Sequence, residues 1–162
     1  MYVERSFSDQ NQILDEADEL AQSAIKLGNR NPQILALIAQ VRIMLDAEIT
    51  MGAILAENAL ALDPCNPMAY AAMASAQLRQ QDYQAARQTA MNGAAIAANT
   101  RLNHWLFSLV GLATLADGNW EKSIGFFERC HAHAPNFRSP MRHLIYLYMA
   151  RSEPQRAKKM IT

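Results

Sequence analysis

The 162-residue chain has few of the residues that interrupt helices or crosslink a fold: six prolines, six glycines and two cysteines. Two cysteines cannot build a disulfide framework, which excludes the small secreted scaffolds that depend on one. No stretch has the roughly 18 consecutive apolar residues that a membrane-spanning helix needs. The opening MYVERSFSDQ has no apolar segment of a secretory signal. We therefore expect a cytoplasmic protein without a membrane partner.

The chain also has no net charge, but its positive and negative residues are unevenly distributed along the sequence. Residues 1–66 carry four Lys/Arg and ten Asp/Glu, a net −6, whereas residues 67–162 carry eleven and five, a net +6. A balanced total argues against direct nucleic-acid binding. The polarity predicts a basic end that can meet an acidic partner or the acidic end of a second copy. The alternative is that the charges lie scattered over solvated faces.

What the chain has in quantity is helix-forming residues. Hydrophobic residues make up 51% of it, enough to bury a core. Alanine, leucine, methionine and glutamine are frequent, and all favour helices. With so few glycines and prolines, this composition predicts an all-α fold of several helices joined by short turns.

The sequence repeats itself. AIKLGNRNP at 24–32 aligns without a gap with ALALDPCNP at 59–67, an offset of 35. Four residues then occupy corresponding places at offsets of 35, 37 and 34: Leu35, Tyr70, Phe107 and Met141. A period of this length indicates stacked helical units, because each unit can cover its apolar face only with a neighbour. The small residues Ala74 and Gly111 predict close approach of paired helices.

The best-preserved unit combines an aromatic residue, a small residue, a turn and a closing proline in Phe107, Gly111, Gly118-Asn119-Trp120, Phe127, Cys130 and Pro135. This pattern resembles the tetratricopeptide repeat. The resemblance covers about residues 10–162 and implies an α-α superhelix, a right-handed solenoid of antiparallel helix pairs. We expect a single domain, 1–162, with a partial unit 10–31, full units 32–66, 67–100 and 104–137, and an incomplete unit 138–162. It departs from the repeat at Ala98, at an insertion near Thr100–Asn103, and at Arg42, where tyrosine is usual.

Both ends of the repeat array are expected to be uncapped. The first helix is predicted at Gln12–Leu27, with capping oxygens in residues 8–11. Its packing face has Ala17, Ala21 and Ala24, a pattern typical of the second helix of a unit. Residues Pro154–Ile161 begin another second helix. The hypothesis is a fragment of a longer protein, or ends buried in a homo-oligomer. The junction around 100–137 is similar to C-terminal repeats of bacterial signalling proteins, in winged-helix transcriptional regulators or adenylate cyclases, which implies a regulatory role.

The resemblance also implies a partner surface on the concave face, lined by the first helix of each unit. Carried onto this chain, that lining includes Met44, Met68, Ser75, Arg79, Trp105, Ser108, Leu112, Arg142, Tyr146 and Met149. Adaptable methionines suit an apolar or amphipathic peptide of a partner protein. The alternative is that each residue only packs against a neighbouring helix. The lysine–asparagine clamp of co-chaperone relatives is missing, which excludes chaperone tails as ligands.

Catalytic and metal chemistry find little support. The cluster Cys130-His131-x-His133 has metal-ligand residue types, but residues one and two apart on a helix do not face each other. No nucleophile has an adjacent base, and there is no glycine-rich phosphate loop. We expect no enzyme, no cofactor and no metal site. The alternatives to a regulatory domain are a free-standing scaffold or secretion chaperone, or a homo-oligomerisation module.

Overall fold

The computed structural model describes residues 7–26, 30–45, 48–98 and 100–161. Within 7–26 the described side chains are those of residues 12, 15, 16, 19, 20 and 22–26. Regular secondary structure in these ranges is entirely helical, which confirms the all-α prediction. The helices are α1 (Phe7–Lys26), α2 (Pro32–Met44), α3 (Ile49–Leu62), α4 (Pro67–Arg79), α5 (Tyr83–Ile96), α6 (Asn103–Ala116), α7 (Trp120–His133), α8 (Arg138–Ala150) and α9 (Pro154–Lys159).

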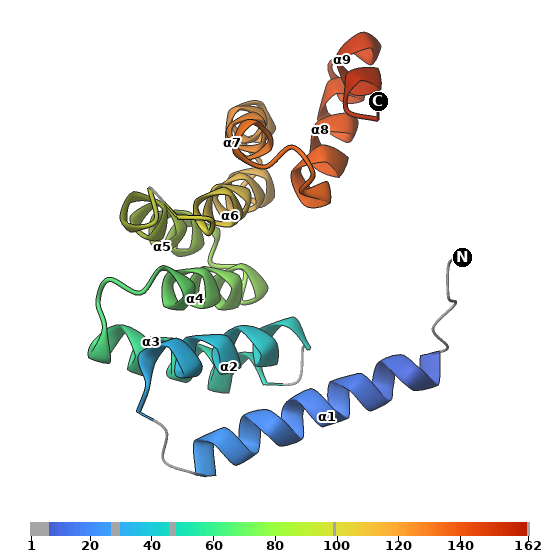
Figure 1. The fold of residues 1–162 in the computed structure, drawn as a ribbon. Coiled ribbons are helices and arrows are strands. Elements are labelled where there is room, and N and C mark those ends of the chain that lie inside the picture. Colours follow the sequence, from blue (N-terminus) through green and yellow to red (C-terminus); the bar gives the residue numbers. More distant parts are fainter. Residues whose placement is uncertain (1–6, 27–29, 46–47, 99, 162) are drawn as a thin grey trace.

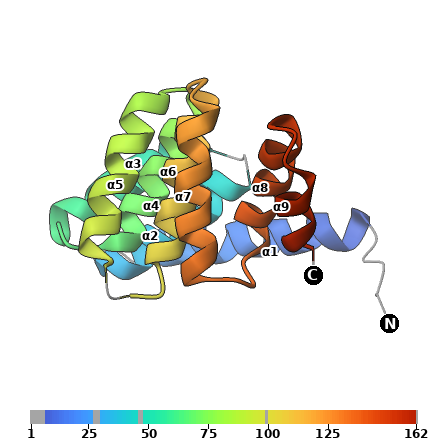
Figure 2. The same cartoon turned by 90° about the horizontal axis from the view of Figure 1, so that it is seen from above.

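The helices form a solenoid. Each packs against the next in the sequence, and α2, α4 and α6 also pack on one another in succession. Figure 1 shows the resulting arc, with α1 and the α8–α9 pair as its two arms and an open side between them. Seen from above, α8 and α9 stand beside the main stack (Figure 2). The predicted architecture of stacked antiparallel helix pairs is confirmed.

The core is divided among three groups of neighbouring helices. The first joins α2, α3 and α4, the second runs from α4 to α7, and the third joins α7, α8 and α9. Leu112 packs against both the second and the third. Many core residues are alanines with no exposed surface. The stability of the fold therefore comes from contacts between neighbouring helices along the stack, and not from one central core.

Small residues set the spacing of the helices. A Cβ on Gly111 would lie 2.7 Å from the ring of Phe127, and one on Gly93 would lie 2.6 Å from Cβ of Tyr70. Ala74 is fully buried. The predicted close approach at Ala74 and Gly111 is confirmed, because a larger side chain at either place would push two helices apart.

Three turns between paired helices share one backbone geometry. Gln81, Gly118 and Ser152 all have positive φ, of 63°, 82° and 59°. The following amides donate to carbonyls five residues earlier, at 2.9, 3.0 and 2.8 Å for Asp82, Asn119 and Glu153. This arrangement is the Schellman motif at the C-terminus of a helix. The side chains of Asp82 and Asn119 then accept a backbone hydrogen bond from the next helix. One residue thus ends the first helix and caps the second.

Two of the three departures from the repeat have local explanations. Arg42, in the usual tyrosine place, is 5% exposed and forms an ion pair with Glu48 at the start of α3. At the insertion, the side chain of Asn103 donates to the carbonyl of Ala94 at 3.0 Å and ties the start of α6 to α5. The extra residues therefore leave the α5–α6 contact intact.

The first helix differs from its prediction. It begins at Phe7 rather than Gln12, so residues 8–11 lie within the helix. No proline or glycine interrupts this segment of the sequence. Ala24 packs partly against the first core group, as predicted. Leu27 and the side chains of Ala17 and Ala21 lie outside the described part of the chain.

Candidate partner-binding surface

The ten residues predicted to line the concave face differ widely in exposure. Three large apolar side chains stand free in solvent: Met44 is 65% exposed, Tyr146 76% and Met149 56%. The two arginines, Arg79 and Arg142, are exposed as well. These five side chains supply apolar surface and positive charge, a combination that suits an acidic amphipathic segment.

Four others are half-buried. Met68 packs against the first core group, and Trp105 and Leu112 pack against the second. The hydroxyl of Ser75 donates to the carbonyl of Ala71 at 2.8 Å, one turn earlier in the same helix. These residues belong partly to the interior, so they shape the surface more than they extend from it.

Ser108 does not fit the predicted lining. Only 2% of its surface is exposed, because α6 is covered on both sides by helices of the second core group. A ligand on the outside of the fold cannot reach this side chain. The register placed Ser108 on a first helix, but it could not tell how closely the neighbouring helices pack over this position.

Sequence reasoning missed Leu37, which is 51% exposed on α2. Its register equivalents are Ala72 and Leu109, at offsets of 35 and 37, and these are 0% and 5% exposed. The same register position is therefore buried in two later units and exposed in the first. The repeat alignment contains this equivalence, but only coordinates show that the cover is incomplete.

A second missed feature is a shallow groove at the C-terminal arm, with a volume of about 490 Å³. We call it the end groove. Its walls are largely apolar, with two arginines at the rim, and consist of Arg138, Met141, Arg142, Ile145, Met160 and Ile161. Of these residues the sequence analysis had singled out Arg142 alone as a partner contact.

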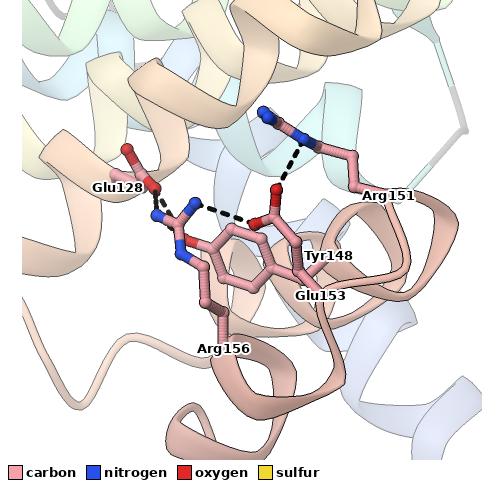
Figure 3. Close-up of polar contacts among 5 residues, drawn as sticks. All are labelled: Glu128, Tyr148, Arg151, Glu153 and Arg156. Carbon is pink, nitrogen blue, oxygen red and sulfur yellow. Dashed lines mark hydrogen bonds and ion pairs between the residues drawn. The ribbon is translucent and has the colours of Figure 1, made fainter.

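The C-terminal arm is fastened by a polar network (Figure 3). The hydroxyl of Tyr148 donates to Glu128 at 2.7 Å, and Arg156 pairs with both Glu128 and Glu153. The guanidinium of Arg156 also lies 4.3 Å from the centre of the Tyr148 ring. Burial, followed by the hydrogen bond to Glu128, raises the pKa of Tyr148 to about 12. The network therefore joins α7, α8 and α9 through side chains.

Cys130 is a packed thiol. It donates to the carbonyl of His104 at 2.9 Å, and burial raises its pKa to about 12. A nucleophile or metal ligand needs the thiolate, which this environment disfavours. The rings of His104 and His133 pack on Phe137 and Phe107. Across the described residues, no three potential ligands gather around one point.

No helix in the described ranges is long and apolar enough to cross a membrane. No protein-family model matches the chain, and no curated protein matches it.

Solved structures do resemble it. A thermophilic TPR protein of Thermus thermophilus has a TM-score of 0.77 at 15% identity, over 93% of this chain and 82% of that one. PilF of Pseudomonas aeruginosa gives 0.73 at 17%, over 93% and 74%. MamA of Desulfovibrio magneticus RS-1 gives 0.67 at 16%, over 91% and 90%. At these identities the likeness establishes the fold.

Proposed function

Because this chain has the tetratricopeptide-repeat fold, we propose that it is a non-catalytic scaffold that binds a segment of another protein on its open side. The observation that carries the proposal is the exposure of Met44, Tyr146 and Met149 in the predicted lining. Large exposed apolar groups near positive charge are a common mark of protein contact sites.

The favoured ligand is an extended or helical segment with apolar and acidic residues. Arg79 and Arg142 are positively charged, and the second half of the chain has a net charge of +6. Charge of one sign steers an oppositely charged partner and weakens with salt. Met68, Trp105 and Leu112 would contribute apolar walls between the exposed groups.

Site-specific crosslinking tests this proposal. A photoreactive amino acid replaces Tyr146, and in a matched control it replaces Met91, which is 41% exposed on α5. Crosslinked protein partners are expected at position 146 and not at 91, and Arg142→Glu should reduce the yield at 146. Equal crosslinking at the two positions would contradict a binding site on the open side.

We extend the proposal to a cytoplasmic regulatory role, with the partner being other domains of a bacterial signalling or transcriptional protein. The support is the sequence similarity of the 100–137 junction to such repeats. A free-standing scaffold or secretion chaperone is the alternative. The gene's complete reading frame decides between them: an attached DNA-binding or cyclase domain supports regulation, and a frame without any further domain removes it.

A further inference from the structure

A pocket in the middle of the stack lies between the end of α5, the start of α6 and the end of α7, and we call it the junction pocket. Its volume is about 370 Å³, and its walls include Ala98, Thr100, Arg101, Asn103, His104 and His133. Figure 2 shows the ends of α5 and α7 at the same edge of the molecule. Six residues, 97–102, join α5 to α6, whereas four join α3 to α4 (63–66) and α7 to α8 (134–137). The longer connection therefore supplies part of the pocket wall.

Hydrogen bonds within the protein hold this wall in place. The hydroxyl of Thr100 donates to the carbonyl of Ala97 at 3.1 Å and accepts from the backbone N–H of Leu102 at 3.2 Å. The side chain of Asn103 is 7% exposed and donates to the carbonyl of Ala94. These contacts fix the position of the wall independently of any ligand.

Two imidazole rings of the junction pocket are held by aromatic contacts instead. The ring of His104 meets Phe137 edge to face, with centroids 5.1 Å apart, and the ring of His133 stacks on Phe107 at 6.4 Å. Within the described ranges, neither ring donates a hydrogen bond to another residue. Their N–H groups are therefore available to a ligand.

The surroundings of the junction pocket are basic. Arg101 is exposed, and it has no ion pair or hydrogen bond with any residue that the structure describes. The sequence contains no acidic residue from 83 to 116 or from 129 to 152, and the pocket walls come from these two stretches. Arg129 lies one turn before His133 on α7 and adds to the positive charge. Such a one-signed environment favours an anion.

We propose that the junction pocket binds the phosphate group of a small phosphorylated molecule. The planar guanidinium of Arg101 pairs with two phosphate oxygens, and the imidazoles of His104 and His133 donate to the others. The volume is near the lower end of the range for small-molecule sites, which fits a phosphate with a short attached group. None of the ten residues predicted for the open side belongs to this pocket, so this inference is independent of the proposed scaffold function.

An NMR titration tests the proposal. Isotope-labelled protein is titrated with glycerol phosphate and with inorganic phosphate, and sodium chloride keeps the ionic strength equal in every sample. We expect saturable shifts of the amide signals of residues 100–104 and 133–134, with tighter binding of the ester than of inorganic phosphate. Glycerol, which lacks the phosphate, should leave these signals in place.

Variants separate the pocket from general charge attraction. Arg101→Gln should weaken glycerol phosphate binding about tenfold or more, because it removes a hydrogen-bonded charge pair. His133→Gln should weaken it less. Lys122→Gln, at the other end of α7, removes the same charge from an exposed side chain and should bind like the wild type. All three residues are exposed, so the remaining signals of the spectrum should stay unchanged and verify the fold.

Three results would overturn the proposal. The first is shifts that do not saturate, or equal losses in Arg101→Gln and Lys122→Gln, which would indicate diffuse attraction to a basic surface. The second is inorganic phosphate binding as tightly as the ester. The third is a phosphoserine peptide binding more tightly than glycerol phosphate, which would indicate a protein ligand. None of these results bears on crosslinking at position 146.

Discussion

Gly93 shows how single residues control this fold. A Cβ at this position would lie 2.6 Å from Tyr70 and 2.9 Å from Leu106, on the two helices that flank α5, whereas a Cβ on Gly125 would meet nothing within 4 Å. Gly93→Ala should lower the free energy of unfolding by about 1–3 kcal/mol through overpacking. Gly125→Ala should raise it by about 0.5–1 kcal/mol through helix propensity. Urea denaturation measures both, and effects of the same sign would contradict the packing.

His143 gives the third core group a pH dependence. Its ring stacks on Phe127 with centroids 4.9 Å apart, and burial, then the charge of Arg142, lowers its pKa below the ordinary 6.5. The unfolded chain therefore binds the proton more tightly. The stability contributed by neutral His143 is present above pH 6.5 and is lost as pH falls through the lowered value.

Thermal melts between pH 7 and pH 5 should accordingly show a falling melting temperature. His143→Phe should reduce the fall, and Arg142→Gln should reduce it partly, because only the weaker cause is removed. An identical pH profile for wild type and His143→Phe would show that this residue is not responsible.

The exposed fraction of a single side chain could not be predicted from the sequence. Register placed Met44, Ser108 and Tyr146 at equivalent faces of first helices, yet Ser108 is 2% exposed and Tyr146 76%. The difference arises from the neighbouring helices, which cover Ser108 almost completely and leave Tyr146 in solvent. Sequence patterns describe one helix at a time, whereas exposure depends on its neighbours.

At the scale of helices, two of the turns between paired helices contain a residue with a strained backbone conformation, and substitution can remove that strain. Gln81 and Ser152 adopt the left-handed conformation that Gly118 adopts at the same place, and residues other than glycine are strained there. Gln81→Gly should raise the free energy of unfolding by about 0.5–1 kcal/mol. Gln80→Gly should lower it, because Gln80 has φ of −78°. Thermal melts of the two neighbouring variants measure this, and a loss at both positions would contradict the strain.

One of these turns was also predicted from the sequence. Gly118-Asn119-Trp120 was identified as a turn within the best-preserved unit, and α6 ends and α7 begins there as expected. Asn-Pro at 31–32 and 66–67 marks the starts of α2 and α4 just as clearly. The start of α1 was missed by five residues, because no comparable signal precedes it.

Over the whole molecule, stability should be graded along the stack. The middle helices α4, α5 and α6 have neighbours on both sides, whereas α1 and α9 each pack mainly on one. Hydrogen exchange followed by mass spectrometry should show the slowest amides in α4–α6 and the fastest in α1 and α9. Arg156→Ala should speed exchange in α9 and leave α4 unchanged. Uniform exchange would indicate a single cooperative unit instead.

The overall architecture followed from the repeat, because a period near 35 residues fixes how neighbouring units stack. The two ends did not follow from it. The reason is that α1 and α9 each pack mainly on one neighbouring helix, so the pattern of the middle units does not apply to them.

The polar network of Glu128, Tyr148 and Arg156 also affects how the molecule responds to force. It holds the last arm of an otherwise serial stack by side chains from three helices. Tension applied at the C-terminus would load this network early, together with the packing of Ala157 in the third core group, because α9 packs mainly on α8. Once it broke, the arm would peel away without disturbing the inner helices, and the molecule would yield in steps rather than all at once.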